Sequence, residues 1–148
     1  MLSIFMIFSA KYLYLIIVVI SLWFIVKKIN KRIFIFSLIY LSSVLIIAKI
    51  LSSFFYNPRP FVVKHFTPLI YHAANNGFPS DHSLIAFAFA SIVFLFNRKL
   101  GFILFILAFL VGMSRVYVGV HHPIDILGSF VISIVVAIIC VKIFPWTK

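Results

Sequence analysis

Residues 79–96 read PSDHSLIAFAFASIVFLF, and this stretch decides the fold class. Proline and serine at its start are typical of the beginning of a helix, where serine suits the N-cap position. The residues after His82 are almost all apolar and extend over about the length that a helix needs to cross a bilayer. The stretch therefore predicts a membrane-spanning helix with Ser80, Asp81 and His82 at one end.

Similar apolar runs lie on both sides of this stretch, and together they predict a bundle of five transmembrane helices. The predicted spans are about 4–26, 33–55, 79–96, 100–118 and 123–144. A long loop over 56–78 separates the second span from the third, and its prolines and glycine discourage a continuous helix. We therefore expect an all-α integral membrane protein.

Composition supports a membrane protein rather than a soluble one. Of the 148 residues, 65% are hydrophobic and only 10% are charged, which is too little polar surface for a soluble domain. One cysteine, Cys140, permits neither an internal disulfide nor a thiolate metal cluster. We expect a single domain over 1–148 with its motifs in 49–125, and a first helix that is retained rather than cleaved as a leader.

The basic residues predict the orientation in the membrane. They lie in short clusters at the ends of apolar runs rather than along one polar face, so the net charge of +11 does not indicate a nucleic-acid partner. Short cytoplasmic connections are enriched in lysine and arginine. The clusters that predict the cytoplasmic side are Lys27, Lys28, Lys31, Arg32, Arg98, Lys99, Lys142 and Lys148. The N-terminus is then outside and the C-terminus inside.

This topology gathers the remaining polar chemistry at the outer face. Every histidine and both acidic residues of the chain fall there: His65, His72, His82, His121, His122, Asp81 and Asp125. Three short segments meet at the same face, namely 59–60, 79–82 and 114–125. Ionisable residues at such a position indicate a functional site.

The residue types of this group suit an anionic phosphate. Arg59 and Arg115 stay charged and present planar forks of donors that match phosphate oxygens. Ser80, at a helix start, adds a hydroxyl to free backbone N–H groups and the positive end of the helix dipole. We therefore expect these three residues to bind substrate.

Two histidines in this group divide nucleophile from acid and base. His121 and Asp125 are four residues apart, so they share one face if a helix begins at or just before His121. The carboxylate then holds one ring nitrogen and leaves the other free to attack phosphorus. His82 is the expected acid and base for the leaving oxygen and the water.

These motifs resemble a known family. The ordered set Arg59-Pro60, Pro79-Ser80-x-His82 and Ser114-Arg115-x5-His121-x3-Asp125 is similar to the motifs of the type-2 phosphatidic acid phosphatase superfamily. The stretches 56–61 and 72–82 look like the bacitracin-resistance type of undecaprenyl-diphosphatase. The resemblance implies a helical membrane bundle and a metal-independent histidine mechanism without a cofactor. It also implies a polyprenyl diphosphate substrate in a bacterial cytoplasmic membrane, with the site facing the periplasm or exterior.

Two positions depart from the superfamily pattern. A lysine usually stands seven residues before the arginine of the first motif, but this chain has Ser52 there and Lys49 one helical turn earlier. Lys49 is therefore the candidate substrate-binding lysine. Asp81 replaces a usual glycine, and we expect it to orient Arg59 or Arg115 near the substrate.

Other functions use the same residues differently. A serine hydrolase with Ser80 or Ser114 lacks a nucleophile-elbow pattern. A small metal-binding transporter could use the outer histidines as ligands, but two arginines in the same group would repel a divalent cation. A phosphatase for phosphatidic acid or phosphatidylglycerol phosphate is the alternative within the same chemistry. We interpret His65 as a solvated bystander and His122 as a neighbour of the nucleophile, and leave His72 open.

Overall fold

The computed structural model describes residues 1–28 and 31–144. Of the basic residues used above for orientation, Lys148 lies outside the described residues and the side chain of Lys28 is not described. The predicted all-α membrane bundle is confirmed, since the described elements are all helical. In chain order these are α1 Leu2–Phe8, η1 Ser9–Leu13, α2 Tyr14–Lys28, α3 Lys31–Phe54, α4 Pro60–Val63, α5 Asp81–Phe96, α6 Arg98–Tyr117 and α7 Pro123–Ile143.

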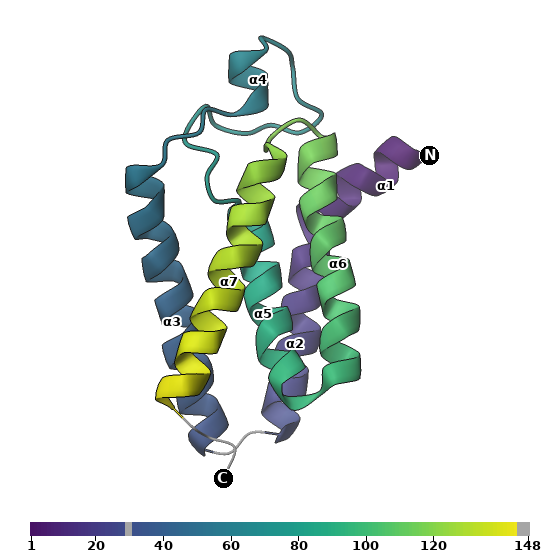
Figure 1. Cartoon of the computed structure of the whole chain (residues 1–148). Coiled ribbons are helices and arrows are strands. Elements are labelled where there is room, and N and C mark those ends of the chain that lie inside the picture. The colour runs from purple at the N-terminus through teal and green to yellow at the C-terminus, as the bar shows by residue number, and fades with distance from the viewer. Residues whose placement is uncertain (29–30, 145–148) are drawn as a thin grey trace.

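Five long helices run side by side (Figure 1), as the five apolar runs predict. The first of them is continuous from α1 through the π-helical segment η1 into α2. Within the described part of the chain, four of the five are long and apolar enough to cross a membrane, and α5 is the exception. Its 16 residues extend only about 24 Å, less than the ~30 Å hydrocarbon core.

The start of α5 confirms the predicted N-cap position. The helix begins at Asp81 with Pro79 just before the cap. Ser80 is the N-cap residue, but its hydroxyl caps no backbone N–H and donates to Ser83 Oγ at 3.2 Å. The Ser83 hydroxyl thus replaces the backbone N–H as the partner of the Ser80 side chain, and the pattern of a helix start does not predict this exchange.

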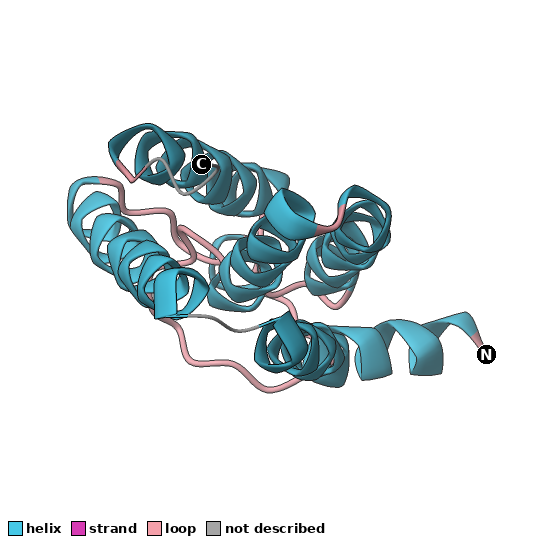
Figure 2. Cartoon of the chain, turned by 90° about the horizontal axis from the view of Figure 1, so that it is seen from below, coloured by secondary structure: helices cyan, strands magenta, loops and turns pink. Residues whose placement is uncertain are grey.

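Helix α5 forms the centre of the bundle, and the other four long helices surround it (Figure 2). Small side chains on α5, among them Ala86, Ala88 and Ala90, are buried and allow close approach of its neighbours. Helices α6 and α7 also pack closely at Gly112, where there is no room for a side chain: a Cβ there would lie 2.3 Å from Ile126 Cγ2. A central helix covered by protein does not have to match the bilayer thickness, which explains how α5 is accommodated.

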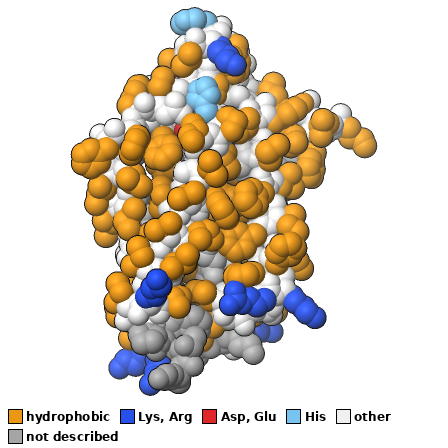
Figure 3. Space-filling model, viewed as in Figure 1, with side chains coloured by type: hydrophobic (Ala, Val, Ile, Leu, Met, Phe, Trp, Pro, Cys, Tyr) orange, Lys and Arg blue, Asp and Glu red, His pale blue; other side chains and the backbone are white. Residues whose placement is uncertain are grey.

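Charged groups divide between the two ends of the bundle. In the face seen in Figure 3, most visible lysines and arginines gather at the lower end, whereas the histidines and the visible acidic group lie at the upper end. The upper end is also where the 55–80 loop and the connection from α6 to α7 meet (Figure 1). The fold thus brings the three sequence motifs to one end of a multi-pass membrane protein.

Candidate active site

The centre of the site is a histidine–carboxylate pair. His121 Nδ1 lies 3.2 Å from Asp125 Oδ2, and both side chains are buried. Helix α7 begins at Pro123, as predicted for the fifth span, with His122 as its N-cap, so the condition of a helix that begins at or just before His121 is not met. The contact still forms because Asp125, in the first turn, turns back and also accepts the His122 backbone N–H at 2.9 Å.

The partners of His121 determine its tautomer. Its Nε2 lies 3.1 Å from Arg59 Nη1, and a guanidinium group can only donate a hydrogen bond. Nε2 must therefore offer a lone pair, and the ring proton sits on Nδ1, where it is donated to Asp125. The result is a neutral imidazole whose unprotonated Nε2 accepts a hydrogen bond from a positively charged group.

Arg59 reaches His121 from the loop between α3 and α5. It is 3% exposed and is held along its whole guanidinium group. Nε donates to Asn75 Oδ1 at 2.9 Å, Nη1 to the Val120 carbonyl at 2.9 Å and Nη2 to the Asn76 carbonyl at 3.3 Å. These bonds orient the arginine before any anion binds, which reduces the entropy cost of binding.

Three asparagines of this loop, Asn57, Asn75 and Asn76, hold the arginine and the carboxylate together, and we call them the asparagine clasp. Asn57 Nδ2 donates to Asp125 Oδ1 at 2.7 Å. The Asn76 side chain accepts from the backbone N–H groups of Asn57 and Phe78 and donates to two carbonyls at the end of α3, those of Ser52 and Phe55. The clasp therefore ties the loop to both α3 and α7.

The clasp was not identified from the sequence. Asn57, Asn75 and Asn76 lie inside the stretches that resemble the family, but isolated asparagines in a loop are ordinary turn residues. The one sequence signal was position, because Asn57 stands two residues before Arg59. Nothing in the sequence indicated that its partner would be Asp125.

The start of α5 is joined directly to α7. The Ser80 N–H donates to the Asp125 carbonyl at 3.3 Å, and Ser129 Oγ donates to the Ser80 carbonyl at 3.0 Å. On the first turn of α5, the His82 ring packs edge-on against Tyr14 of α2 with ring centroids 4.4 Å apart. His82 lies close enough to Arg115 for the guanidinium charge to act on its ring.

Arg115, near the end of α6, supplies a second guanidinium group. It is 2% exposed, and its Nη1 donates to the Ala10 carbonyl at 3.2 Å. Ala10 belongs to the π-helical segment η1, where the altered backbone pattern is often found beside functional sites. Among the described residues, Arg115 Nε and Nη2 have no hydrogen-bond partner. A buried, unsatisfied guanidinium is costly alone and is well suited to an anion.

Burial and charge set the protonation of the groups outside the spanning helices. Burial lowers the pKa of His121 to about 4; the hydrogen bond to Asp125 opposes this change, and the charges of Arg59 and Arg115 add to it. Burial also lowers the pKa of His72, with a contribution from the charge of Arg59. At neutral pH both imidazoles are therefore uncharged.

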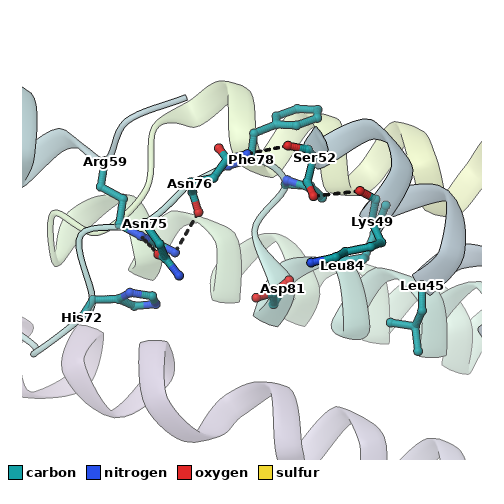
Figure 4. Close-up of a pocket in the computed structure, with 12 residues that line it drawn as sticks. Leu45, Lys49, Ser52, Arg59, His72, Asn75, Asn76, Phe78, Asp81 and Leu84 are labelled. Carbon is teal, nitrogen blue, oxygen red and sulfur yellow. Dashed lines mark hydrogen bonds between the residues drawn. The ribbon is translucent and has the colours of Figure 1, made fainter. Parts of the chain in front are cut away.

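A cavity of about 420 Å³ opens beside Arg59 (Figure 4). Its polar wall contains Lys49, His72 and Asp81, together with Asn75 and Asn76 of the clasp. The His72 ring is 6.1 Å from the His121 ring, so this cavity adjoins the histidine–carboxylate pair. It provides room for a ligand that reaches the pair from the direction of α3.

The structure brings most of the predicted site residues together. Arg59, Arg115, His82, His121 and Asp125 share one region, and Lys49 and Asp81 line the adjoining cavity. The hydroxyl of Ser80 instead faces Ser83.

The remaining histidines hold different positions. His65 is exposed, and His122 Nε2 lies 3.2 Å from the Pro58 carbonyl, where it contacts the loop rather than the cavity. His72, left open above, lines the cavity.

The described residues do not support the metal-binding alternative. No three histidine, cysteine, aspartate or glutamate side chains among them are arranged as a metal-ligand group. His121 uses Nδ1 for Asp125 and presents Nε2 to Arg59, so a cation at Nε2 would meet a guanidinium group. The geometry favours an anion at this position.

Comparison with known proteins gives a family and several relatives. A family model described as the PAP2 superfamily matches residues 32–148. Undecaprenyl-diphosphatase BcrC of Bacillus subtilis (strain 168) is 42% identical over 92 residues, which cover 62% of this chain and 48% of that protein. Bacitracin transport permease protein BcrC of Bacillus licheniformis is 34% identical over 110 residues, which cover 74% and 54%. The chain thus spans about half the length of these curated relatives.

A solved structure shows the same architecture. The crystal structure of LpxE from Aquifex aeolicus superposes with a TM-score of 0.78 at 28% sequence identity. The superposition covers 95% of this chain and 86% of that one. The similarity therefore includes nearly the whole bundle, beyond the segments that carry the motifs.

Proposed function

The chain belongs to the PAP2 superfamily, and we propose that it is a membrane lipid phosphatase that hydrolyses undecaprenyl diphosphate to undecaprenyl phosphate and phosphate. The superfamily prediction made from the motifs is confirmed. The observation that carries the proposal is the arrangement of His121, whose unprotonated Nε2 faces Arg59 while its Nδ1–H is held by Asp125. The identity to BcrC of Bacillus subtilis supports the substrate.

The first step transfers the terminal phosphoryl group to His121. Arg59 exchanges its hydrogen bond to His121 Nε2 for one to a phosphate oxygen, and the released lone pair attacks the terminal phosphorus. A P–N bond forms, and the P–O bond to the bridging oxygen breaks. His82 donates its proton to that oxygen, and the lipid monophosphate leaves. Arg59 and the free N–H groups of Arg115 bind the oxygens that gain charge.

The second step returns the enzyme to its starting state. Water attacks the phosphorus of the phosphohistidine while His82 takes one of its protons. The P–N bond breaks, its electrons return to Nε2 as a lone pair, and inorganic phosphate leaves. Asp125 stabilises the charge on the His121 ring during both steps through the Nδ1–H bond. The cycle uses neither a metal ion nor another cofactor.

The lipid tail and the charge distribution indicate where the reaction takes place. The single domain over 1–148 lies in the bacterial cytoplasmic membrane with the site at the outer, periplasmic face, because the opposite end carries the basic clusters. The prenyl chain stays in the bilayer while the diphosphate enters the cavity beside Arg59. The product is the carrier lipid of cell-wall synthesis, and this recycling is consistent with a role in bacitracin resistance.

The test uses purified protein in detergent with undecaprenyl diphosphate and excess chelator. We expect phosphate release to continue without divalent metal and to fall at least about 1,000-fold in His121→Ala. His65→Ala, which removes an exposed histidine of the loop between α3 and α5, is the control and should retain activity. Full activity in His121→Ala would end the mechanism. Faster turnover of phosphatidylglycerol phosphate or phosphatidic acid would overturn the substrate assignment.

A further inference from the structure

The cavity beside Arg59 has a polar end and an apolar end. Arg59, His72, Asn75 and Asn76 lie at the end next to His121, whereas Leu45, Ala48 and Leu84 form an apolar wall. Leu45 is 56% exposed on the outside of the bundle, where lipid would contact it. A ligand with a charged head and an apolar tail can therefore lie along this cavity with its head at His121.

A second cavity continues the apolar end. It measures about 410 Å³, is formed by α2, α3 and α5, and exposes no polar surface. The two cavities share Leu45 and Leu84, so they adjoin. Together they form a path that begins next to His121, passes the polar wall of the first cavity and ends in the apolar second cavity. This path determines which part of a lipid diphosphate meets which residue.

Along this path the inner phosphate of a diphosphate has one available position. The terminal phosphate must lie at His121 Nε2, beside Arg59, for transfer to occur. The tail leaves past Leu45 and Leu84, so the inner phosphate, which joins the two, lies between them. Besides Arg59, Lys49 is the cation that lines this part of the cavity among the described residues.

We propose that Lys49 binds the inner phosphate and thereby makes the enzyme select lipid diphosphates over lipid monophosphates. The inference rests on the proposed function and adds a specificity-determining residue to it. Figure 4 shows the Lys49 side chain directed across the cavity towards Asp81 on α5. The two groups are not paired at salt-bridge distance among the described residues, so the amine is available to an anion that enters between them.

Asp81 has a defined part in this selection. Its carboxylate lines the same cavity and would repel a phosphate that enters without a cation to bind it. Lys49 offsets that charge and supplies donors, whereas the terminal phosphate depends on the two arginines. A monophosphate places its single phosphate at His121 and leaves the Lys49 position without an anion. Only a diphosphate uses both positions.

The test compares two substrates that share one tail, farnesyl diphosphate and farnesyl monophosphate. We expect Lys49→Gln to lower kcat/KM for the diphosphate about 10- to 100-fold, since a charge-assisted hydrogen bond is lost, and to change it less than about 2-fold for the monophosphate. Lys49→Arg should restore most of the diphosphate activity. Lys64→Gln is the matched control, because Lys64 is an exposed lysine of the outer loop that does not line the cavity.

The outcomes separate this inference from the function on which it rests. Equal losses of kcat/KM on both substrates, or no loss on either, would overturn the role of Lys49 even if wild-type enzyme is active. Wild-type enzyme that is inactive on undecaprenyl diphosphate as well as on both farnesyl lipids would instead reject the proposed function. In that case a binding measurement still tests the role of Lys49. It compares binding of the two farnesyl lipids to the His121→Ala protein and to the protein that carries both His121→Ala and Lys49→Gln. Loss of diphosphate binding alone supports the inference, and unchanged binding rejects it.

Discussion

Gly77 has no side chain at the point where the loop passes Asp125, and Gly77→Ala tests whether the histidine–carboxylate geometry controls catalysis. A Cβ there would lie 3.0 Å from Asp125 Oδ2 and 3.1 Å from the Asn57 carbonyl oxygen. Restoring an ordinary contact of 3.4 Å to the carboxylate requires about 0.4 Å of movement. The glycine cannot retreat freely, because its N–H donates to the Asn57 carbonyl at 2.8 Å.

The Asp125 carboxylate must therefore move, and this displaces the Oδ2 atom that accepts the hydrogen bond from His121 Nδ1. A misplacement of about 1 Å in an active site costs roughly 100-fold in rate, so about 0.4 Å should cost roughly 5- to 10-fold. We expect this loss in kcat, with KM little changed, because the cavity that receives the lipid is not altered.

The assay is steady-state phosphate release from farnesyl diphosphate, with thermal unfolding in detergent measured in parallel. Ala74→Ser, which adds an atom to an exposed residue of the same loop, serves as the control and should behave as wild type. Wild-type kcat in Gly77→Ala would refute the argument that the position of Asp125 limits the reaction. A loss that appears only in KM would refute it equally.

Two further predictions concern the same pair. Asn57→Leu removes the donor at 2.7 Å from Asp125 Oδ1 and leaves a buried carboxylate oxygen without its partner, at a cost of about 1–3 kcal/mol. We expect kcat to fall about 10-fold and the unfolding midpoint to drop, and wild-type values of both in this variant would contradict the role given to the clasp. Because burial lowers the pKa of His121 from 6.5 to about 4, its imidazole should stay neutral as the pH falls from 7 to about 5 and gain a proton only near pH 4. Nitrogen-15 NMR of histidine-labelled protein measures this directly, and protonation of His121 near pH 6.5 would show that the ring is not desolvated.

Long apolar runs made the helices predictable, including the start of α7 at Pro123, whereas the start of α5 shows that hydropathy does not determine the contacts at a helix end. Hydropathy locates the middle of a span well, because some twenty residues contribute to it. Helix ends depend on single contacts, such as the bond from the His122 N–H to Asp125. The pairing of His121 with Asp125 was predicted from helical spacing, but it forms from a residue that lies before the helix.

The candidate site was predictable where side-chain type and spacing carry the chemistry, as with Arg59, Arg115 and the histidines. Contacts to backbone carbonyls were not predictable, since every residue has a carbonyl and none is distinguished in the sequence. The bond from Arg115 to the carbonyl of Ala10, in the π-helical segment, joins residues that are 105 positions apart. Only tertiary packing brings that segment beside α6.

Asn76 makes four side-chain bonds, and this saturation has a consequence for which residues can replace it. Its amide nitrogen supplies two hydrogens and its oxygen receives two. Aspartate is the same size but has no hydrogens to give, and glutamine has the right group on a stem that is one methylene longer. Among the twenty amino acids only asparagine meets both requirements. The identity of this position is thus set by the chain geometry that it maintains.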